Sequence, residues 1–328
     1  MRKILSGQMQ GTDQSLLGAI NRSLHGLVQP ATTEQATIST QAGSKVKRTG
    51  KPRFTWKRAI LYLILFVLLI YAFFPTFWLL STSIKPQLEA FQNPPTWWPH
   101  NPTLFSYQIL PADQQGFVAY FRNSLIVSVC TTLLTLLAAV PAGYVLSRFR
   151  FRGARALLLV ILGTQMFPYV TILISLYTLF RQLHMLNTYP ALVLSFTTFS
   201  LPFSIWMLKG FCDTMPTDLE DAARVDGLSR LKTLWYIVLP IIIPGVVAVG
   251  FFAFLNSWNE LLYALTLTSS PNMRTIPAGF VLTYIGEFQD RWPDMMAASV
   301  VVSLPIVVLF TVFQKQLVSG LTAGAVKG

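Results

Sequence analysis

The sequence predicts an all-α polytopic membrane protein with six transmembrane helices, and three observations lead to this class. Charged residues make up 12% of the 328-residue chain, whereas soluble domains carry about 25%. The mean hydropathy is +0.52. Six stretches of 19 to 25 residues are almost free of charge, and roughly 20 helical residues are enough to cross the hydrocarbon core of a bilayer.

The six stretches define the predicted spans. In chain order they are Ala59–Leu80, Asn123–Leu146, Ala156–Phe180, Tyr189–Leu208, Ile241–Leu265 and Met295–Phe313. Five contain no charged residue, and the fifth in order contains a single carboxylate, Glu260. Because lipid cannot satisfy free backbone polar groups, continuous apolar segments of this length are expected to be helices.

The distribution of Lys and Arg predicts the orientation. If both termini are cytoplasmic, 20 of the 25 basic residues lie on the cytoplasmic side, as the positive-inside rule requires. The net charge of +12 is then a topology signal, which argues against a nucleic-acid binder. The two cysteines and three histidines are widely separated, so no metal site is predicted.

Residues 1–57 are predicted to be a cytoplasmic N-terminal extension that precedes the transmembrane domain, residues 58–328. The stretch 29–57 is rich in Thr, Ser, Gln and Lys and is typical of a disordered linker. Within 15–28, apolar residues recur at helical spacing. This segment is either an amphipathic helix on the membrane or on a partner, or a weakly helical and dispensable tail.

The loop at about 209–240, between the fourth and fifth spans, predicts a short rigid helix facing the cytoplasm. Thr217 and Glu220 have the spacing of a capping box, and the first turn is acidic, as the helix dipole favours. The pair Ala222–Ala223 is small enough to let another surface approach closely. Gly227 can adopt the left-handed conformation that ends a helix. Such a helix suits docking into a groove of another protein.

The same loop resembles the EAA loop of ABC importer permeases, which reads E-A-A-x-x-D-G followed by an apolar residue, Leu and Pro. The matching residues here are Asp221, Ala222, Ala223, Arg224, Val225, Asp226 and Gly227, and then Val238, Leu239 and Pro240. Asp221 stands where the family has glutamate, and the adjacent Glu220 keeps a longer carboxylate nearby. Further stretches similar to MalG-like sugar permeases are Ser83–Pro86, Tyr120–Ser124, Ser257–Glu260 and Gly320–Gly328.

The resemblance, which covers roughly residues 59–328, implies the type I ABC importer permease fold. It implies a sugar importer in a bacterial or archaeal cytoplasmic membrane, with a second MalF-like permease, a MalK-like ATPase dimer and an extracytoplasmic solute-binding protein as partners. ATP and Mg²⁺ would bind to the ATPase, because Gly50 and Lys51 are followed by proline and form no phosphate-binding loop. No cofactor and no catalytic residue are therefore expected in this chain.

The resemblance also assigns contacts to the ATPase. The coupling residues that it implies are Glu220, Asp221, Ala222, Ala223, Arg224, Asp226 and Gly227. The C-terminal tail, with Thr322, Gly324 and Lys327, is implied to reach the ATPase pair.

Five polar residues within the spans are candidates for the translocation pathway. In the fifth span, Asn256 and Glu260 are four residues apart and share a helix face, while Asn259 lies about 100° away. A carboxylate inside a membrane must face a cavity or a partner. Glu260 therefore either contacts substrate or pairs with an arginine or a freed backbone group. Gln165 and Tyr169 flank a proline that is expected to kink the third span.

Two rival functions stay open at this point. Within the same superfamily, the solute is a polyol or a glycerol phosphate instead of a sugar. In a different class, the chain is an ion-coupled secondary transporter in which Glu260 titrates. The EAA-type loop argues against this second rival, since such a transporter has no need of an ATPase-docking helix.

Overall fold

The computed structural model describes residues 56–112, 116–284 and 292–325, and within these ranges every regular element is helical. The all-α prediction is confirmed for this part of the chain. The chain divides into two units between Leu68 and Leu69. The described part of the first unit is the beginning of α3 (Trp56–Ser83). The predicted N-terminal extension and its helix at 15–28 lie outside the described residues.

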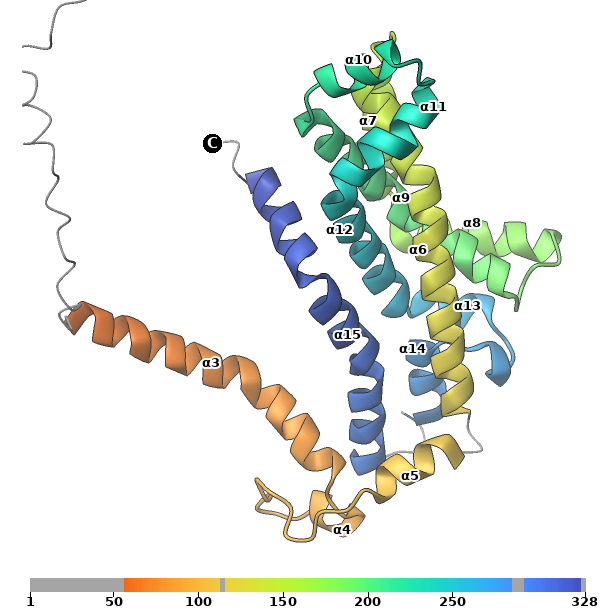
Figure 1. The fold of residues 1–328 in the computed structure, drawn as a ribbon. Coiled ribbons are helices and arrows are strands. Elements are labelled where there is room, and N and C mark those ends of the chain that lie inside the picture. The colour runs from red at the N-terminus through yellow and green to blue at the C-terminus, as the bar shows by residue number, and fades with distance from the viewer. Residues whose placement is uncertain (1–55, 113–115, 285–291, 326–328) are drawn as a thin grey trace, which may run out of the picture. The chain divides into compact units, whose positions relative to one another are not determined.

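The second unit is built around four helices. They are α6 (Phe117–Arg148), α9 (Tyr189–Thr214), α12 (Leu239–Trp258) and α15 (Trp292–Ala325). Helix α6 packs along α9 and α12, and α12 also packs against α9 and α15 (Figure 1). The α6–α9 contact is close because Gly143 has no side chain: a Cβ atom there would lie 2.9 Å from the backbone nitrogen of Lys209.

Shorter elements connect these helices. They are α4 (Gln87–Ala90), α5 (Phe105–Ala112), α7 (Ala154–Gly163), a 3₁₀ turn (Thr164–Met166), α8 (Tyr169–Gln182), α10 (Asp218–Val225), α11 (Arg230–Thr233), a π-helical turn (Leu234–Val238), α13 (Leu262–Leu267), a 3₁₀ turn (Pro271–Met273), α14 (Ile276–Gly279) and a second π-helical turn (Phe280–Tyr284). The proline-rich segment after α3 includes the helices α4 and α5.

Four described helices are long and apolar enough to cross a membrane by themselves: Arg58–Ser83, Phe117–Arg148, Tyr189–Thr214 and Trp292–Leu317. Two further helix pairs meet the same criteria together but are sharply bent, at 94° and 82°. The described chain therefore has up to six spans, and it reaches the predicted six if each bent pair counts as one.

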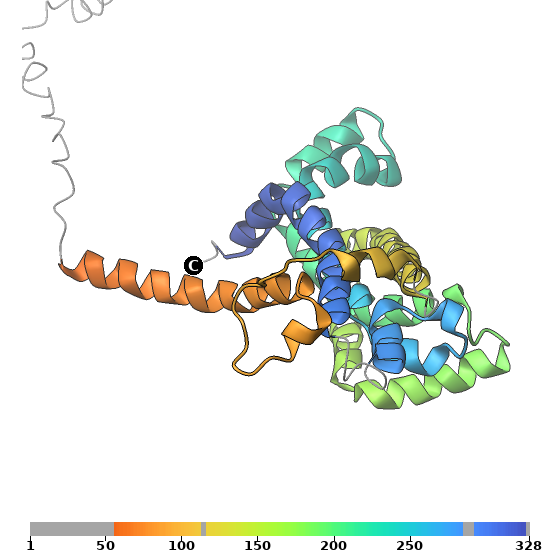
Figure 2. The ribbon, with the colours of Figure 1, turned by 90° about the horizontal axis from the view of Figure 1, so that it is seen from below.

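The third predicted span, Ala156–Phe180, is not one kinked helix. Helices α7 and α8 meet at an angle of 94°, and α8 runs across the direction of α6 (Figure 1). In Figure 2, where α6 is seen nearly end-on, α8 extends sideways. Pro168 forces Phe167 into an extended conformation, with φ −71° and ψ 140°, and this ends the helical path. The loss of the one backbone hydrogen bond that a proline cannot donate would by itself have produced only a kink.

The fifth predicted span, Ile241–Leu265, is also interrupted. The helix axis turns by 82° between Arg230–Ile241 and Ile243–Trp258, where a π-helical turn precedes Pro240 and Pro244. Prolines remove backbone donors, so the ladder of hydrogen bonds cannot run straight through. Helix α12 then ends at Trp258. The helical spacing assumed for Asn256 and Glu260 therefore does not apply.

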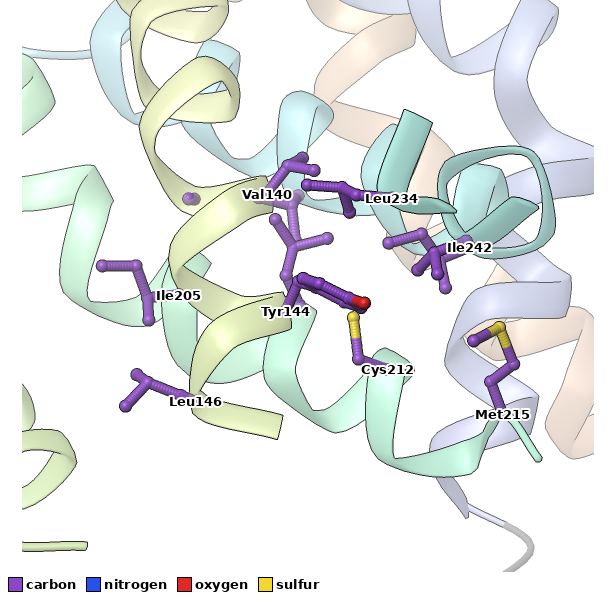
Figure 3. Close-up of a cluster of buried hydrophobic side chains, with 12 residues drawn as sticks. Val140, Tyr144, Leu146, Ile205, Cys212, Met215, Leu234 and Ile242 are labelled. Atoms are coloured by element: carbon purple, nitrogen blue, oxygen red, sulfur yellow. The ribbon is translucent and has the colours of Figure 1, made fainter. Parts of the chain in front are cut away.

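Buried apolar side chains form a cluster at the end of the bundle next to α10. Val140 and Tyr144 of α6 lie with Cys212 of α9 and with Leu234 and Ile242 (Figure 3). This cluster packs the ends of α6, α9 and α12 together. It thereby gives a firm base to the short helices that follow α9.

Candidate functional site

Helix α10 is the predicted docking helix, and its end is formed as the sequence indicates. Gly227 has φ +83°. The N–H of Gly227 donates to the carbonyl of Arg224, and the N–H of Leu228 donates to the carbonyl of Ala223, both at 3.0 Å. This is the hydrogen-bond pattern of a Schellman motif, which needs a left-handed residue where the glycine stands. The left-handed helix end predicted at Gly227 is confirmed.

The start of α10 differs from the prediction. Thr217 has helical dihedral angles, φ −70° and ψ −25°, and its side chain makes no capping hydrogen bond. The carbonyl of Thr217 instead accepts from the N–H groups of Glu220 and Asp221. The prediction of a capping box is therefore wrong, because both oxygens of the Glu220 carboxylate are bound elsewhere, to Arg148 and to Tyr144.

Arg148 is the last residue of α6. Glu220 is 6% exposed, and its Oε1 accepts from Arg148 Nε at 2.5 Å, while its Oε2 accepts from the Tyr144 hydroxyl at 2.9 Å. Arg148 also donates through Nη2 to the carbonyl of Met215 at 2.8 Å. One buried ion pair thus ties α10 to the ends of α6 and α9. Nothing in the sequence pattern pairs Arg148 or Tyr144 with Glu220.

The outer face of α10 is open. Of the expected coupling residues, Asp221, Ala222, Arg224, Asp226 and Gly227 are exposed, whereas Glu220 and Ala223 are buried. Asp221 forms an ion pair with Arg224 one turn later on the same face. Glu220 therefore does not add a second carboxylate to this face as the sequence led us to expect. The buried Glu220 side chain binds Arg148 and Tyr144 instead.

A second site lies where the bent spans meet α9. A cavity of about 560 Å³ is lined by Leu162, Gln165, Tyr169, Phe196, Phe199, Ser200, Phe203, Phe252, Asn256, Ser257 and Glu260. The structure thus brings Gln165, Tyr169, Asn256 and Glu260 together at one cavity. Asn259 is not among the lining residues, since its amide donates to the carbonyl of Leu255 in its own helix.

Glu260 stands in the break between α12 and α13. Its carboxylate accepts from the Tyr169 hydroxyl at 2.9 Å, from the N–H of Tyr263 at 3.0 Å and from the N–H of Ala264 at 3.1 Å. The last two are backbone donors at the start of α13, which has no earlier turn to satisfy them. Pairing with freed backbone groups, one of the alternatives for this residue, is thus present in the structure.

Another carboxylate of interest, which is buried, lies outside the spans in the segment after α3. Glu89 is 6% exposed, and its Oε1 accepts from the Thr96 hydroxyl, the His100 backbone N–H and His100 Nδ1 at 2.9 to 3.0 Å. These hydrogen bonds, foremost that from the His100 backbone, hold the pKa of Glu89 below its usual range. Nearby, Lys85 donates to the carbonyl of Thr96, and burial lowers its pKa.

A helical bundle with broken spans around a partly polar cavity is an arrangement that membrane transport proteins use. The comparisons with known proteins agree. Residues 135–322 match the family of binding-protein-dependent transport system inner membrane components. The chain belongs to this family, and it is the permease subunit of an ABC importer, a transporter component and not an enzyme.

Curated relatives match over nearly their whole length. The chain is 40% identical to a sulfoquinovosyl glycerol transport system permease of Agrobacterium fabrum, over 89% of this chain and 100% of the relative. It is 34% identical to the trehalose/maltose transport system permease MalG of Thermococcus litoralis, over 83% and 98%. The resemblance to MalG-like permeases is thereby confirmed.

Among solved structures, a bacterial ABC transporter that imports the acidic polysaccharide alginate is similar in fold. The match has a TM-score of 0.70 and 20% identity, and it covers 81% of this chain and 100% of that one. At this identity the likeness concerns the fold alone. It supports the predicted ABC importer permease fold.

Proposed function

We propose that this chain is the MalG-like permease of an ATP-driven importer for a carbohydrate. The observation that carries the proposal is the similarity to relatives named for sugar-containing solutes. Besides the two relatives above, a diacetylchitobiose uptake permease of Streptomyces coelicolor is 36% identical over 80% of this chain. The proposed location is a bacterial or archaeal cytoplasmic membrane with both termini in the cytoplasm, as the distribution of basic residues favours.

The proposed assembly contains a MalF-like second permease, a MalK-like ATPase dimer that binds ATP and Mg²⁺, and an extracytoplasmic solute-binding protein. The need for a binding protein is part of the family's description. This chain would form half of the translocation pathway. Alternating access would be driven by nucleotide turnover on the ATPase.

In this proposal the exposed face of α10 docks on the ATPase. Ala222 leaves room for close approach, and the paired Asp221 and Arg224 offer a polar rim. Movement of the ATPase would be passed to the bundle through Glu220 and Arg148, because this ion pair ties α10 to the end of α6. The end of α15, where Thr322 and Gly324 lie within the helix, is proposed as a second contact; Lys327 is outside the described residues.

The test is uptake into proteoliposomes that contain the complete importer. We expect uptake of a labelled sugar that needs internal ATP and the binding protein and is unaffected by a protonophore. Uptake of a polyol or glycerol phosphate but no sugar would assign the other solute class. Uptake without ATP that a protonophore abolishes would identify a secondary transporter.

The docking face is tested in the same preparation. Ala222→Arg places a long charged side chain on an exposed position, so folding should persist while the ATPase no longer binds tightly. Leu88→Arg, in the exposed part of α4, is the matched control and should bind the ATPase normally. Normal ATPase binding by both variants would remove α10 from the coupling path.

A further inference from the structure

A small cavity of about 130 Å³ is lined by residues of α10, α11 and the end of α6. Three arginines contribute to its wall, together with residues that carry a carboxylate or a hydroxyl group: Arg148, Arg224, Arg230, Glu220, Tyr144 and Thr233. Helices α10 and α11 are in contact, and they lie at the end of the bundle where α6 ends (Figure 1). Positive charge from three separate elements therefore meets at one small space.

The positive charges at this cavity are only partly balanced. Arg148 is paired with Glu220 in the interior. Arg224 is paired with Asp221, but both side chains are more than half exposed, and ion pairs so exposed contribute little. Among the described residues, no carboxylate lies within ion-pair distance of Arg230. Its guanidinium carbon lies 4.6 Å from the centre of the Phe149 ring instead. The cavity therefore has an excess of positive charge.

Phosphate is the anion that suits this arrangement. Guanidinium groups bind phosphate oxygens through paired N–H donors. A phosphate group also offers more oxygens and more charge than a carboxylate, so it can accept from several arginines at once. Arg148 uses Nε and Nη2 for Glu220 and Met215, and its Nη1 has no acceptor within the described chain. The charge of Glu220 is offset, because Arg148 and Tyr144 bind its two oxygens.

The cavity lies where two candidate spans end. Arg148 is the last residue of one candidate span, and Arg230 is the first residue of a bent pair that counts as another. Large aromatic side chains near both residues in the sequence are exposed, namely Phe151, Trp235 and Tyr236. Aromatic residues beside basic ones are typical of the level at which membrane proteins meet lipid headgroups. Basic pockets between spans at this level bind phosphate-bearing headgroups.

We propose that this cavity is a binding site for a phosphate group, carried either by an anionic lipid or by a soluble phosphate compound. Arg230 would be its main unpaired cation, with Arg148 and Arg224 as further donors. Occupation would hold α10 and α11 against the end of α6 and so stabilise the position of α10. The site does not depend on which solute the protein transports.

Free phosphate is tested on the full-length chain in a non-ionic detergent. Sodium phosphate is added at constant ionic strength, and the melting temperature is recorded. We expect a rise of about 2–4 °C at saturation, as for a ligand that binds the folded state alone. Arg230→Gln should need roughly tenfold more phosphate for the same rise, because one charged contact is lost. Arg230→Lys keeps the charge and should lie between the two.

The lipid source is tested by native mass spectrometry of the full-length chain from nanodiscs of phosphatidylglycerol and phosphatidylcholine. Retention of phosphatidylglycerol by the wild type, and its loss from Arg230→Gln, would assign the site to an anionic lipid. The zwitterionic phosphatidylcholine should not be retained, because its choline group offsets the phosphate charge. A response to free phosphate alone would assign the site to a soluble phosphate compound. Either result supports the phosphate site.

Arg155→Gln is the matched control, since Arg155 is an exposed arginine of α7 that does not line the cavity. It should respond to both probes as the wild type does. No response to either probe, an unchanged response in Arg230→Gln, or an equal loss in Arg155→Gln would each overturn the site. If Arg230→Gln weakens binding of the ATPase and changes neither phosphate response, the cavity takes an acidic group of that partner, and the phosphate site is overturned as well.

Discussion

Glu220 and Glu260 are both largely withdrawn from solvent, yet they are stabilised in different ways. Glu220 pairs with a cation, Arg148, and with the hydroxyl of Tyr144, and so connects two helices that are far apart in sequence. Among the residues that the structure describes, Glu260 has no cation as a hydrogen-bond partner, and it is held by backbone N–H groups of α13 and by Tyr169. One residue joins a peripheral helix to the bundle, and the other stabilises a break within a span.

The difference shows that a carboxylate within a membrane span can be held by backbone donors where no cation is bound to it. Backbone donors at an interrupted helix are an alternative to a cation, because lipid offers them no other partner. Removing one member of a charge pair leaves the other member buried and uncompensated, whereas removing the Glu260 carboxylate leaves neutral backbone N–H donors without their acceptor. Mutations at Glu220 and at Glu260 should therefore lower the free energy of unfolding by different amounts.

The largest effect is expected at the ion pair. Glu220→Ala leaves Arg148 without its carboxylate, and breaking a buried pair in this way costs about 3–5 kcal/mol. We expect a lower melting temperature of the detergent-solubilised chain and loss of ATPase binding. In the double variant with Arg148→Ala the loss of stability should be smaller than the sum of the two single losses. Strictly additive losses would show that the pair does not couple α10 to α6.

A smaller effect is expected at Glu260, in the break between α12 and α13. Glu260→Gln keeps the size of the side chain, but its amide group faces N–H donors, so about 1.5–3 kcal/mol of hydrogen bonding is lost. Uptake should be reduced and should still depend on ATP, with or without a proton gradient. Asn259→Ala is the neighbouring control and should be close to wild type. Complete loss of uptake by an assembled Glu260→Gln complex with normal nucleotide turnover would contradict the structural role.

Two glycines, one at the end of α10 and one in α9, should change the free energy of unfolding in opposite directions when each is replaced by alanine. Gly227 needs a positive φ, and no atom lies within 4 Å of a Cβ built there, so Gly227→Ala should cost about 1–2 kcal/mol through the backbone alone. Gly210, inside α9 and equally unobstructed, should gain roughly 0.5–1 kcal/mol as alanine. Thermal unfolding measures both. Equal shifts for the two variants would argue against the left-handed end of α10.

The smallest effect is expected at Glu89, whose partners lie in the segment after α3, outside the predicted spans. Its folded pKa is lowered, so its contribution to stability is present above the ordinary pKa of a glutamate and is lost as pH falls through the lowered value. Fluorescence of Trp97 and Trp98 should therefore stay constant near neutral pH and change only in acid. Glu89→Gln should abolish that acid transition, and an unchanged transition in this variant would assign it to another group.

The sequence by itself determined the helical class, the approximate positions of the spans and the short helix that Gly227 ends. Each of these depends on local properties: apolar length, backbone freedom at a glycine and the absence of charge. A local signal of the same kind located Gln165, Tyr169, Asn256 and Glu260, since polar residues within apolar stretches are readily seen.

Only the tertiary structure decided what these residues contact. Thr217 and Glu220 have the spacing of a capping box, but Arg148, 72 residues earlier in the chain, competes successfully for the carboxylate. Likewise, a proline in a span indicates a bend, but the 94° turn between α7 and α8 depends on how both helices pack. The partners of Glu260 follow from the same cause. Burial and long-range pairing depend on the packing of segments that are distant in the sequence. The local spacing of residues does not determine which of these segments come into contact.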